Sequence, residues 1–385
     1  MPQWFGFAIF FPVVTLLYGG AHYYIYSWFV RLAQPPKKVR RILFYVFIFL
    51  VASFPAGKIL GWHNFNSFNY LLNLIAAVWM GHAFYFFLFA LGSDLLITLV
   101  KVIGFGRKMS ARTPLFYKRA LVAGITGGVL IIGGCALQEA RSFRVTCLEI
   151  PLRGLPPELD GFSIVQVSDI HYGMLTRNQE LSRILARIND LQPDMVAITG
   201  DLVDESVSHM EEMRVPLSRI KSRHGVFAVT GNHEYYAGVD RAVAIMKAAN
   251  IKVLRNEILA LPGGLQILGI DDLTGSRRMG QGTPDFDRLV SSLNHQKPSI
   301  LLYHQPIMFE KIASCGIGLQ LSGHTHGGQL FPVIYISKMI YPRTPGLHKI
   351  GDIYLYVSWG IGTWGPPMRF KAPPELVFIR LRCPK

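Results

Sequence analysis

Charged residues are scarce in this sequence, and acidic residues are almost absent from its first third. Asp, Glu, Lys and Arg make up 16% of the 385 residues, against about a quarter in typical soluble proteins. Residues 1–141 hold 13 of the 39 Lys and Arg but only 2 of the 24 Asp and Glu. So little charge in one segment excludes a chain that is surrounded by water along its whole length.

Cysteine is scarce as well. The four cysteines, Cys135, Cys147, Cys315 and Cys383, include no C-x-x-C pair, so neither a zinc ribbon nor a thioredoxin-type redox site is expected. The sequence favours free thiols. A disulfide between Cys147 and Cys383 stays open as the alternative, because they fall on or beside the first and last candidate strands of the second domain.

The first third consists largely of apolar runs. Four of them show no polar face of the kind that a helix in a soluble protein exposes: residues 5–30, 42–56, 70–100 and 120–137. A helix needs about 20 residues to cross a bilayer, and the second run reaches that length only if it continues through Ile59 and Leu60. We therefore predict an all-α membrane domain of about four transmembrane helices.

Basic residues in the short loops predict how these helices are oriented. Five Lys or Arg follow the first run and six follow the third, whereas the second loop has only Lys58 at its edge. Such residues stay in the cytoplasm, so four spans predict a multi-pass protein of the cell membrane whose second domain lies on the exocytoplasmic side. These loops also account for most of the net charge of +15, and nucleic acid is not expected as a specific partner.

The second domain is predicted to have an α/β fold. We assign residues 1–141 to the membrane domain and 142–385 to the second domain, with a linker at 138–143. From residue 144, short β-branched runs alternate with amphipathic stretches, which is typical of α/β proteins. Strands are expected at 143–150, 162–167, 195–199, 226–229, 265–270, 300–303, 319–322, 353–357 and 376–382, and helices at 178–191 and 239–249.

A polar cluster follows the end of five of these strands. The clusters are Asp169-Ile170-His171, Gly200-Asp201, Gly231-Asn232-His233-Glu234, His304 and Gly323-His324-Thr325-His326. Singly, each pattern is ordinary, since Gly-Asp and Gly-Asn pairs indicate turns and a lone His is more often structural. Strand ends in an α/β sheet meet at one crevice, however, and carboxylate, imidazole and amide groups together are typical of a metal site.

These five blocks, in this order, resemble the signature of the calcineurin-like metallophosphoesterases, which reads D-x-H, G-D, G-N-H-D/E, H and G-H-x-H. The resemblance covers residues 144–382. The stretches at 167–173 and 323–330 and the tail at 360–375 are similar to the bacterial membrane-associated branch that includes the YkuE-type enzymes. The resemblance implies a four-layer αββα sandwich with two metals at the sheet edge.

The resemblance also implies a ligand set for two divalent metal ions. Asp169, His171 and His326 would hold one ion, Asn232, His304 and His324 the other, and Asp201 would bridge them. Mixed nitrogen and oxygen ligands suit Mn, Fe or Zn. Two such ions lower the pKa of a shared water. The implied activity is therefore hydrolysis of phosphomonoester, phosphodiester or pyrophosphate bonds by metal-activated hydroxide.

His233 is implied to be catalytic rather than a ligand, and to protonate the leaving oxygen. Glu234 and Asp204 are either partners that orient imidazole rings or ordinary loop carboxylates. Trp359 stands where many relatives carry Arg, so a phosphate contact is missing there, and Arg369 is the residue expected to supply it. Trp359 and Trp364 either stack on a base or press on an acyl chain of the substrate, or they pack in the core, which is favoured for both.

Several substrates stay open. The apolar run 331–341, close to His324 and His326, is either a buried element or a surface for the acyl chains of a lipid-linked phosphoester. One alternative is a pyrophosphohydrolase acting on nucleotide-linked acyl sugars like UDP-2,3-diacylglucosamine in lipid A synthesis, which requires a cytoplasmic site. Another is a tethered hydrolase of soluble phosphoesters. An inactive sensor or transporter subunit is disfavoured because no ligand position is degenerate.

Overall fold

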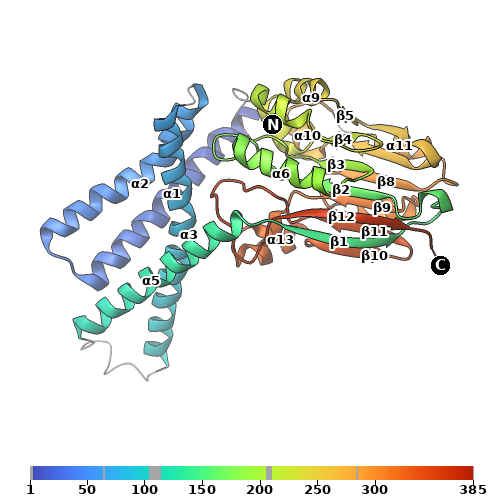
Figure 1. The fold of residues 1–385 in the computed structure, drawn as a ribbon. Coiled ribbons are helices and arrows are strands. Elements are labelled where there is room, and N and C mark those ends of the chain that lie inside the picture. Colours follow the sequence, from blue (N-terminus) through green and yellow to red (C-terminus); the bar gives the residue numbers. More distant parts are fainter. Residues whose placement is uncertain (1–2, 64–65, 104–113, 205–209, 283–284, 385) are drawn as a thin grey trace. The chain divides into compact units, whose positions relative to one another are not determined.

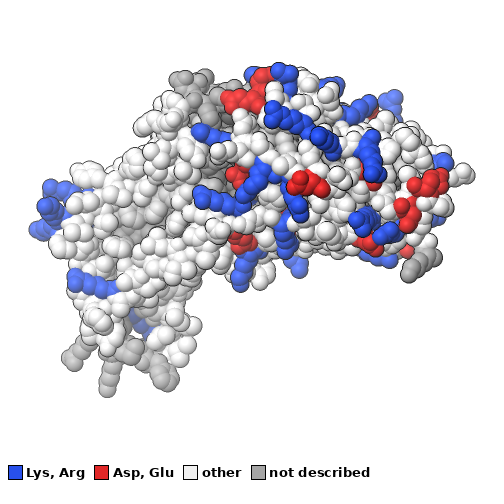
Figure 2. Space-filling model, viewed as in Figure 1, with Lys and Arg blue, Asp and Glu red and all other residues white. Residues whose placement is uncertain are grey.

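The computed structural model of the chain describes residues 3–63, 66–103, 114–204, 210–282 and 285–384. It divides into two compact units (Figure 1). The helical unit comprises Met1–Cys135 with Gly365–Pro367, and the α/β unit comprises Ala136–Trp364 with Met368–Lys385. Charged side chains are spread over the visible face of the α/β unit, whereas the visible surface of the helical unit is mostly uncharged (Figure 2).

The helical unit is built from long helices. These are α1 (Gln3–Ala33), α2 (Lys37–His63), α3 (Ser67–Val102) and α5 (Leu115–Ala140). Among the described residues, three helices are long and apolar enough to cross a membrane, at Lys37–Leu60, Ser67–Val102 and Leu115–Ala140. The side chains of residues 3–14 lie outside the described part, so a fourth span at 5–30 stays a prediction.

The second and third apolar runs each lie within a single helix. The second apolar run does continue through Ile59 and Leu60, because α2 passes Pro55 without ending. The third run forms one continuous helix, which starts at a cap where the Asn66 side chain accepts a hydrogen bond from the backbone N–H of Asn69 (2.9 Å). The predicted linker at 138–143 is partly wrong, since α5 remains helical to Ala140.

Two six-stranded sheets form the α/β unit. The first has the order β1-β12-β2-β3-β4-β5 and the second the order β10-β11-β9-β8-β7-β6. In the first sheet β2 to β5 are parallel, and in the second β7, β8, β9 and β11 are parallel. The strands of the first sheet are β1 (Arg144–Pro151), β2 (Ser163–Val167), β3 (Met195–Thr199), β4 (Val226–Val229), β5 (Ile251–Val253) and β12 (Glu375–Arg382). Those of the second are β6 (Glu257–Ala260), β7 (Gln266–Ile270), β8 (Ser299–Tyr303), β9 (Leu319–Ser322), β10 (Gly346–Ile350) and β11 (Ile353–Val357).

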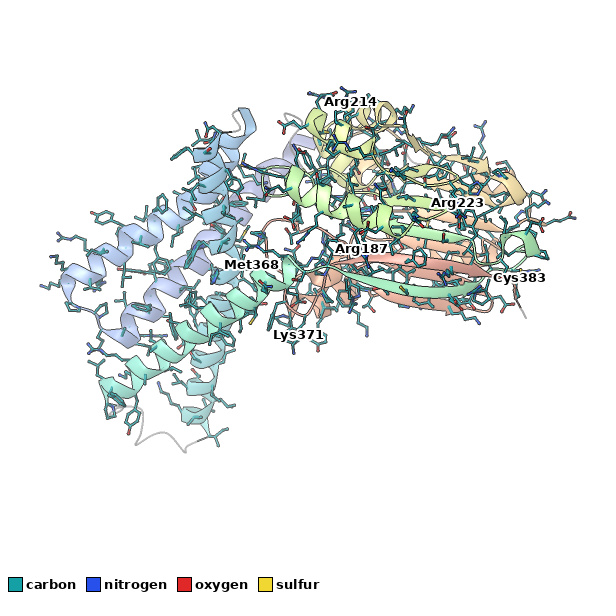
Figure 3. All side chains as sticks on the ribbon, in the orientation of Figure 1. Arg187, Arg214, Arg223, Met368, Lys371 and Cys383 are labelled. Atoms are coloured by element: carbon teal, nitrogen blue, oxygen red, sulfur yellow. The ribbon has the colours of Figure 1, made fainter. Side chains whose placement is uncertain are left out.

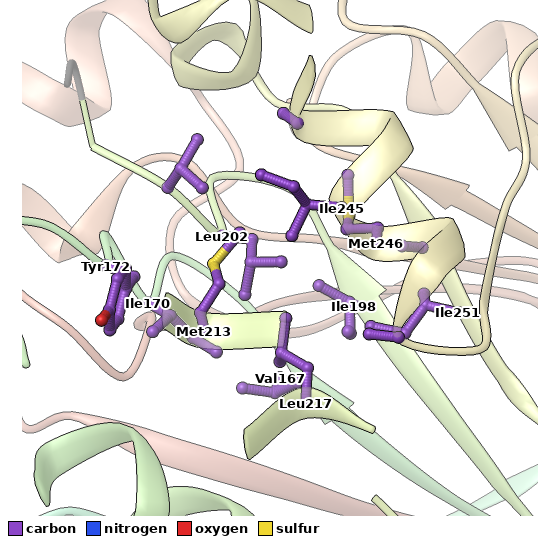
Figure 4. Packing of buried hydrophobic residues seen from close by; sticks show 14 of the residues in the cluster. Val167, Ile170, Tyr172, Ile198, Leu202, Met213, Leu217, Ile245, Met246 and Ile251 are labelled. Atoms are coloured by element: carbon purple, nitrogen blue, oxygen red, sulfur yellow. The ribbon is translucent and has the colours of Figure 1, made fainter. Parts of the chain in front are cut away.

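Three cores separate four layers. Helices α6 (Asn178–Asp190), α7 (Arg214–Leu217) and α9 (Val239–Ala248) cover the outer face of the first sheet. Figure 4 shows part of this core, where Ile245 and Met246 of α9 pack near Ile198 of β3. The inner faces of the sheets share a second core, and α11 (Phe286–Ser291) with α12 (Phe309–Ser314) covers the second sheet. The predicted four-layer αββα sandwich is confirmed.

The pairing of β1 with β12 decides the question of the disulfide. These terminal strands do pair, in parallel, with Cys147 opposite Phe378. Cys383 comes five residues after Phe378, which at about 3.3 Å per residue is far beyond the span of a disulfide. Cys383 lies at the opposite end of the α/β unit from Lys371 (Figure 3). All four cysteines are free in the described part of the chain.

Candidate metal centre

The polar clusters lie where strands of both sheets end. Asp169 and His171 follow β2, Asp201 follows β3, and Asn232 and His233 open α8 (Asn232–Ala237) after β4. His304 follows β8, and His324 and His326 follow β9. Asp169, His171, Asp201, His324 and His326 all have positive φ, between 48° and 71°. Non-glycine residues rarely adopt this left-handed backbone, and such strain gathers at functional sites.

Asp169, His171 and His326 form the first group of ligand atoms. One ligand atom from each residue lies within 4.8 Å of the others, and all three side chains are buried. His171 Nε2 is 2.9 Å from His326 Nε2, and His326 Nε2 is 3.5 Å from Asp169 Oδ1. Two imidazole nitrogens and a carboxylate oxygen therefore point at one another, as they would around a cation.

The second group is Asp201, His304 and His324. Asp201 Oδ2 is 3.1 Å from His304 Nε2, and His304 Nε2 is 3.1 Å from His324 Nδ1. The same Asp201 Oδ2 is 3.8 Å from His171 Nε2 in the first group. The Asp201 carboxylate therefore lies between the two groups, which is the position that a bridging ligand needs.

Asn232 fits the same site. Its side chain is 7% exposed, and its buried Oδ1 has no hydrogen-bond partner among the described residues. Buried amide oxygens are nearly always paired. The described part of the chain likewise gives no partner to the buried Nδ1 of His171. Asn232 stands between Gly231, where a Cβ would meet Asp201, and His233, whose N–H donates to Asp201 Oδ1 (2.9 Å), so an acceptor left open on this turn is consistent with a bound cation.

Burial keeps most of the imidazole groups neutral. Burial, followed by the neighbouring His233, lowers the pKa of His171 to about 3, and burial with His304 lowers that of His324 to about 4. Burial would also lower the pKa of His304, but Asp201 outweighs it and holds this pKa well above its usual value. Neutral imidazoles offer the lone pairs that a metal requires.

Glu234 holds the turn that carries Asp201. Its carboxylate accepts hydrogen bonds from the backbone N–H groups of Gly231 (2.6 Å), Asp201 (3.0 Å) and Val203 (3.1 Å). The expectation that Glu234 orients an imidazole ring is therefore wrong, since its oxygens face backbone amides. Gly231 allows this close packing, because a Cβ there would meet the backbone nitrogen of Asp201 at 2.5 Å.

His233 lies beside the ligand groups. Asp204 Oδ1 is 3.4 Å from His233 Nδ1, so Asp204 takes the position expected of a partner that orients this ring. The His233 ring is 4.6 Å from that of His171 and 6.2 Å from that of Trp364, measured between centroids. Trp364 is 54% exposed and places an aromatic surface next to the site.

Arg369 is buried, and its donors are directed at the protein. The guanidinium donates hydrogen bonds to the carbonyl oxygens of Trp359 (2.8 Å), Gly362 and Ala372, and Nη2 lies 3.0 Å from His326 Nδ1. This geometry favours a role in positioning the tail and His326 over the predicted contact with substrate. Trp359 packs its ring against the turn at Gly327, as the core-packing alternative expects.

Tyr341 was missed as a site residue. Its hydroxyl is 2.8 Å from His324 Nε2, so it fixes the orientation of a ring whose other nitrogen faces His304. The sequence placed Tyr341 only in an apolar run, and no local pattern marks it. That run forms α13 (Val333–Ile340), which has no buried residue, so the alternative of a buried element is wrong.

Comparison with known proteins identifies the family. Residues 162–328 match the family described as Calcineurin-like phosphoesterase. A metallophosphoesterase of Campylobacter jejuni is 32% identical over 98% of this chain and 100% of its own length. Metallophosphoesterase YkuE of Bacillus subtilis is 31% identical over 72% of this chain and 99% of its own. A metallophosphoesterase of Helicobacter pylori is 39% identical over 57% of this chain, and the match spans 59% of that protein. The chain therefore belongs to the calcineurin-like metallophosphoesterases, a family named for metal-dependent cleavage of phosphoesters.

Proposed function

We propose that this protein is a membrane-anchored phosphoesterase that hydrolyses phosphomonoester, phosphodiester or pyrophosphate bonds with two divalent ions of Mn, Fe or Zn. The position of Asp201 between two groups of ligand atoms carries this proposal. Asp169, His171 and His326 would hold one ion, Asn232, His304 and His324 the other, and Asp201 would bridge them. Bound there, the ions would lower the pKa of a water and neutralise phosphoryl oxygens.

The remaining site residues orient groups and move a proton. His233 is assigned to protonation of the leaving oxygen through Nε2, because Asp204 beside Nδ1 fixes the ring and stabilises its protonated form. Glu234 keeps the backbone around Asp201 in place through three amide hydrogen bonds. Trp364, exposed next to His233, would contact the group attached to the phosphate.

A variant at Asp201 tests the two-metal site. Asp201→Ala should abolish hydrolysis and lower the content of both metals, because the lost carboxylate would leave two cations facing each other. The full chain in proteoliposomes is analysed for metals by mass spectrometry and assayed on phosphomonoesters, phosphodiesters and lipid diphosphates. Asp240→Ala is the matched control, since the Asp240 side chain is 91% exposed. Retention of two metals per chain in Asp201→Ala would refute the bridging role.

The substrate is proposed to be lipid-linked. Three helices could span a membrane, and anchoring by them would bring the site near a lipid surface, where a lipid phosphoester is presented at high local concentration. The same proteoliposomes assayed side by side on lipid-linked and soluble phosphoesters test this assignment. A preference for soluble esters would instead identify a tethered hydrolase of soluble compounds.

We further propose that the α/β unit lies on the exocytoplasmic side. This rests on the basic loops after the first and third runs, and the continuity of α3 supports a single crossing there. A reporter that is active only outside the cytoplasm, fused after Leu137 or after Lys385, should be active at both positions. If a cytoplasmic reporter fluoresces at both positions instead, the orientation is inverted and a nucleotide-linked acyl sugar becomes the favoured substrate.

A further inference from the structure

Helix α13 gathers exposed apolar side chains on the α/β unit. Among the described residues of that unit, eight large apolar side chains are at least 44% exposed, and half of them are on this one helix. They are Tyr335 (62%), Ile336 (59%), Met339 (84%) and Ile340 (66%). Apolar side chains gathered in this way mark a surface that contacts a membrane or another molecule.

The four side chains share one face of the helix. At 3.6 residues per turn, positions 335, 336, 339 and 340 span about 140° of its circumference. Ser337 and the exposed Lys338 lie on the other side, and the backbone at Ile334 packs against the turn at Gly328. This division between an apolar face and a polar face is that of a helix lying in a membrane interface.

The end of a candidate membrane span is bonded to the tail of the α/β unit. The last residues of α5, from Ala136, belong to that unit. Ala136 O accepts a hydrogen bond from Arg369 N (2.9 Å), and the Glu139 carboxylate accepts from the N–H groups of Lys371 (3.1 Å) and Ala372 (3.0 Å). Lys371 is labelled in Figure 3.

The same tail segment pairs with the residues that lead into α13. Phe331 N donates to Phe370 O (3.0 Å), and Phe370 N donates to Gln329 O (3.0 Å). The chain thus leaves a span at Ala140 while segment 369–372 links that point to the start of α13. At its far end, α13 is followed by Tyr341, which contacts His324 of the candidate metal centre.

We propose that α13 lies in the interface of the lipid bilayer, with Tyr335, Ile336, Met339 and Ile340 among the acyl chains, and holds the metal centre at the membrane surface. The bilayer is the occupant because the residues that lead into α13 are linked, through hydrogen bonds of segment 369–372, to the point where an apolar span ends. Insertion would remove four large apolar side chains from water, which favours binding of this face to the bilayer. The proposal rests on membrane anchoring and does not require hydrolysis.

Quenching by brominated lipids tests the contact directly. The full chain is reconstituted in phosphatidylcholine vesicles with or without bromine on the acyl chains. Met339→Trp and Ile336→Trp should each add fluorescence that is lost in the brominated vesicles. Lys338→Trp, on the polar face, should add fluorescence that is quenched far less. Val215→Trp, at an exposed apolar site on α7, should add fluorescence that is not quenched.

Two outcomes overturn the proposal. Equal emission from Met339→Trp in both kinds of vesicle would place α13 away from the acyl chains. A blue shift of this emission without quenching would indicate that a protein partner or a second copy of this chain covers the helix. Unchanged metal content in each variant shows that the α/β unit is folded. Quenching is measured without substrate. Absence of quenching would therefore not contradict the proposed phosphoesterase activity, and absence of activity would not contradict a contact shown by quenching.

Discussion

Buried polar residues are used differently in the two units of this protein. In the helical unit, His22 has both ring nitrogens engaged, with Trp79 Nε1 and with Tyr18 O, each at 2.8 Å. Asn69 donates to Leu60 O (3.1 Å). In the α/β unit, buried polar residues from five strand ends converge, and some of their atoms, such as Asn232 Oδ1, have no partner in the described part of the chain.

Convergence, rather than a missing partner, distinguishes the two units, because the buried Tyr18 hydroxyl of the helical unit also has no hydrogen-bond partner among the described residues. A hydrogen bond to a backbone carbonyl four residues earlier, as in His22, satisfies the side chain within its own helix. Residues such as His171 and His326 come from positions 155 apart in the sequence, and their Nε2 atoms are 2.9 Å apart. Arg369 Nη2 lies 3.0 Å from His326 Nδ1, so a neutral His326 carries its proton on Nε2 and donates it to His171. Imidazoles gathered in this way with the carboxylates of Asp169 and Asp201 are typical of a functional site.

The largest effect short of losing a metal ligand is expected at His233. His233→Asn should retain both metals and lower kcat by about two to four decades for substrates with poor leaving groups, because the variant cannot donate the proton. Substrates with activated leaving groups should be affected much less. Single-turnover kinetics on a matched pair of esters checks this, with Asp240→Asn as the control at an exposed site. Undiminished turnover of the poor substrate would remove His233 from the reaction.

A smaller effect is expected at Tyr341. Tyr341→Phe removes the hydroxyl that contacts His324 Nε2, and loss of such a partner typically costs about 10–100-fold in metal affinity or activity. Metal titration of the full chain should show one weakened site. Tyr335→Phe, on the exposed face of α13, is the matched control. Equal metal affinity in both variants would show that Tyr341 only packs against the ring.

Strand ends made most of the site predictable from the sequence. The buried central strands, such as Met195–Thr199 and Val226–Val229, lie between two layers and are therefore largely continuous apolar runs. A polar cluster directly after such a run has to lie at the sheet edge. The strands that were not predicted are β5, which has three residues, and the antiparallel strands β6 and β10, which end the second sheet and are partly exposed.

The parts of the site that were missed depend on tertiary contacts. Tyr341 comes 17 residues after His324, and α13 brings its hydroxyl back to the ring. The spacing of apolar residues in the sequence does not predict such a contact. Glu234 did carry a signal, because a glutamate three residues after an N-cap residue can accept a hydrogen bond from the backbone N–H of that residue, as Glu234 does from Gly231 (2.6 Å). Its role in holding Asp201 follows from that cap together with the pairing of neighbouring strands.

The smallest effect is expected in the helical unit, where it tests the comparison from the other side. Asp94 accepts hydrogen bonds from Tyr24 Oη (2.7 Å) and from Arg31 Nη2. Asp94→Asn keeps the shape but removes the charge, and interactions of this kind between membrane helices average about 0.6 kcal/mol. Thermal unfolding in detergent should therefore shift slightly while kcat and metal content stay the same, with Tyr23→Phe as an exposed control. A loss of activity comparable to that of Tyr341→Phe would mean that polar groups of the helical unit also serve the reaction. The distinction between locally bonded polar residues in the helical unit and converging ones in the α/β unit would then fail for this protein.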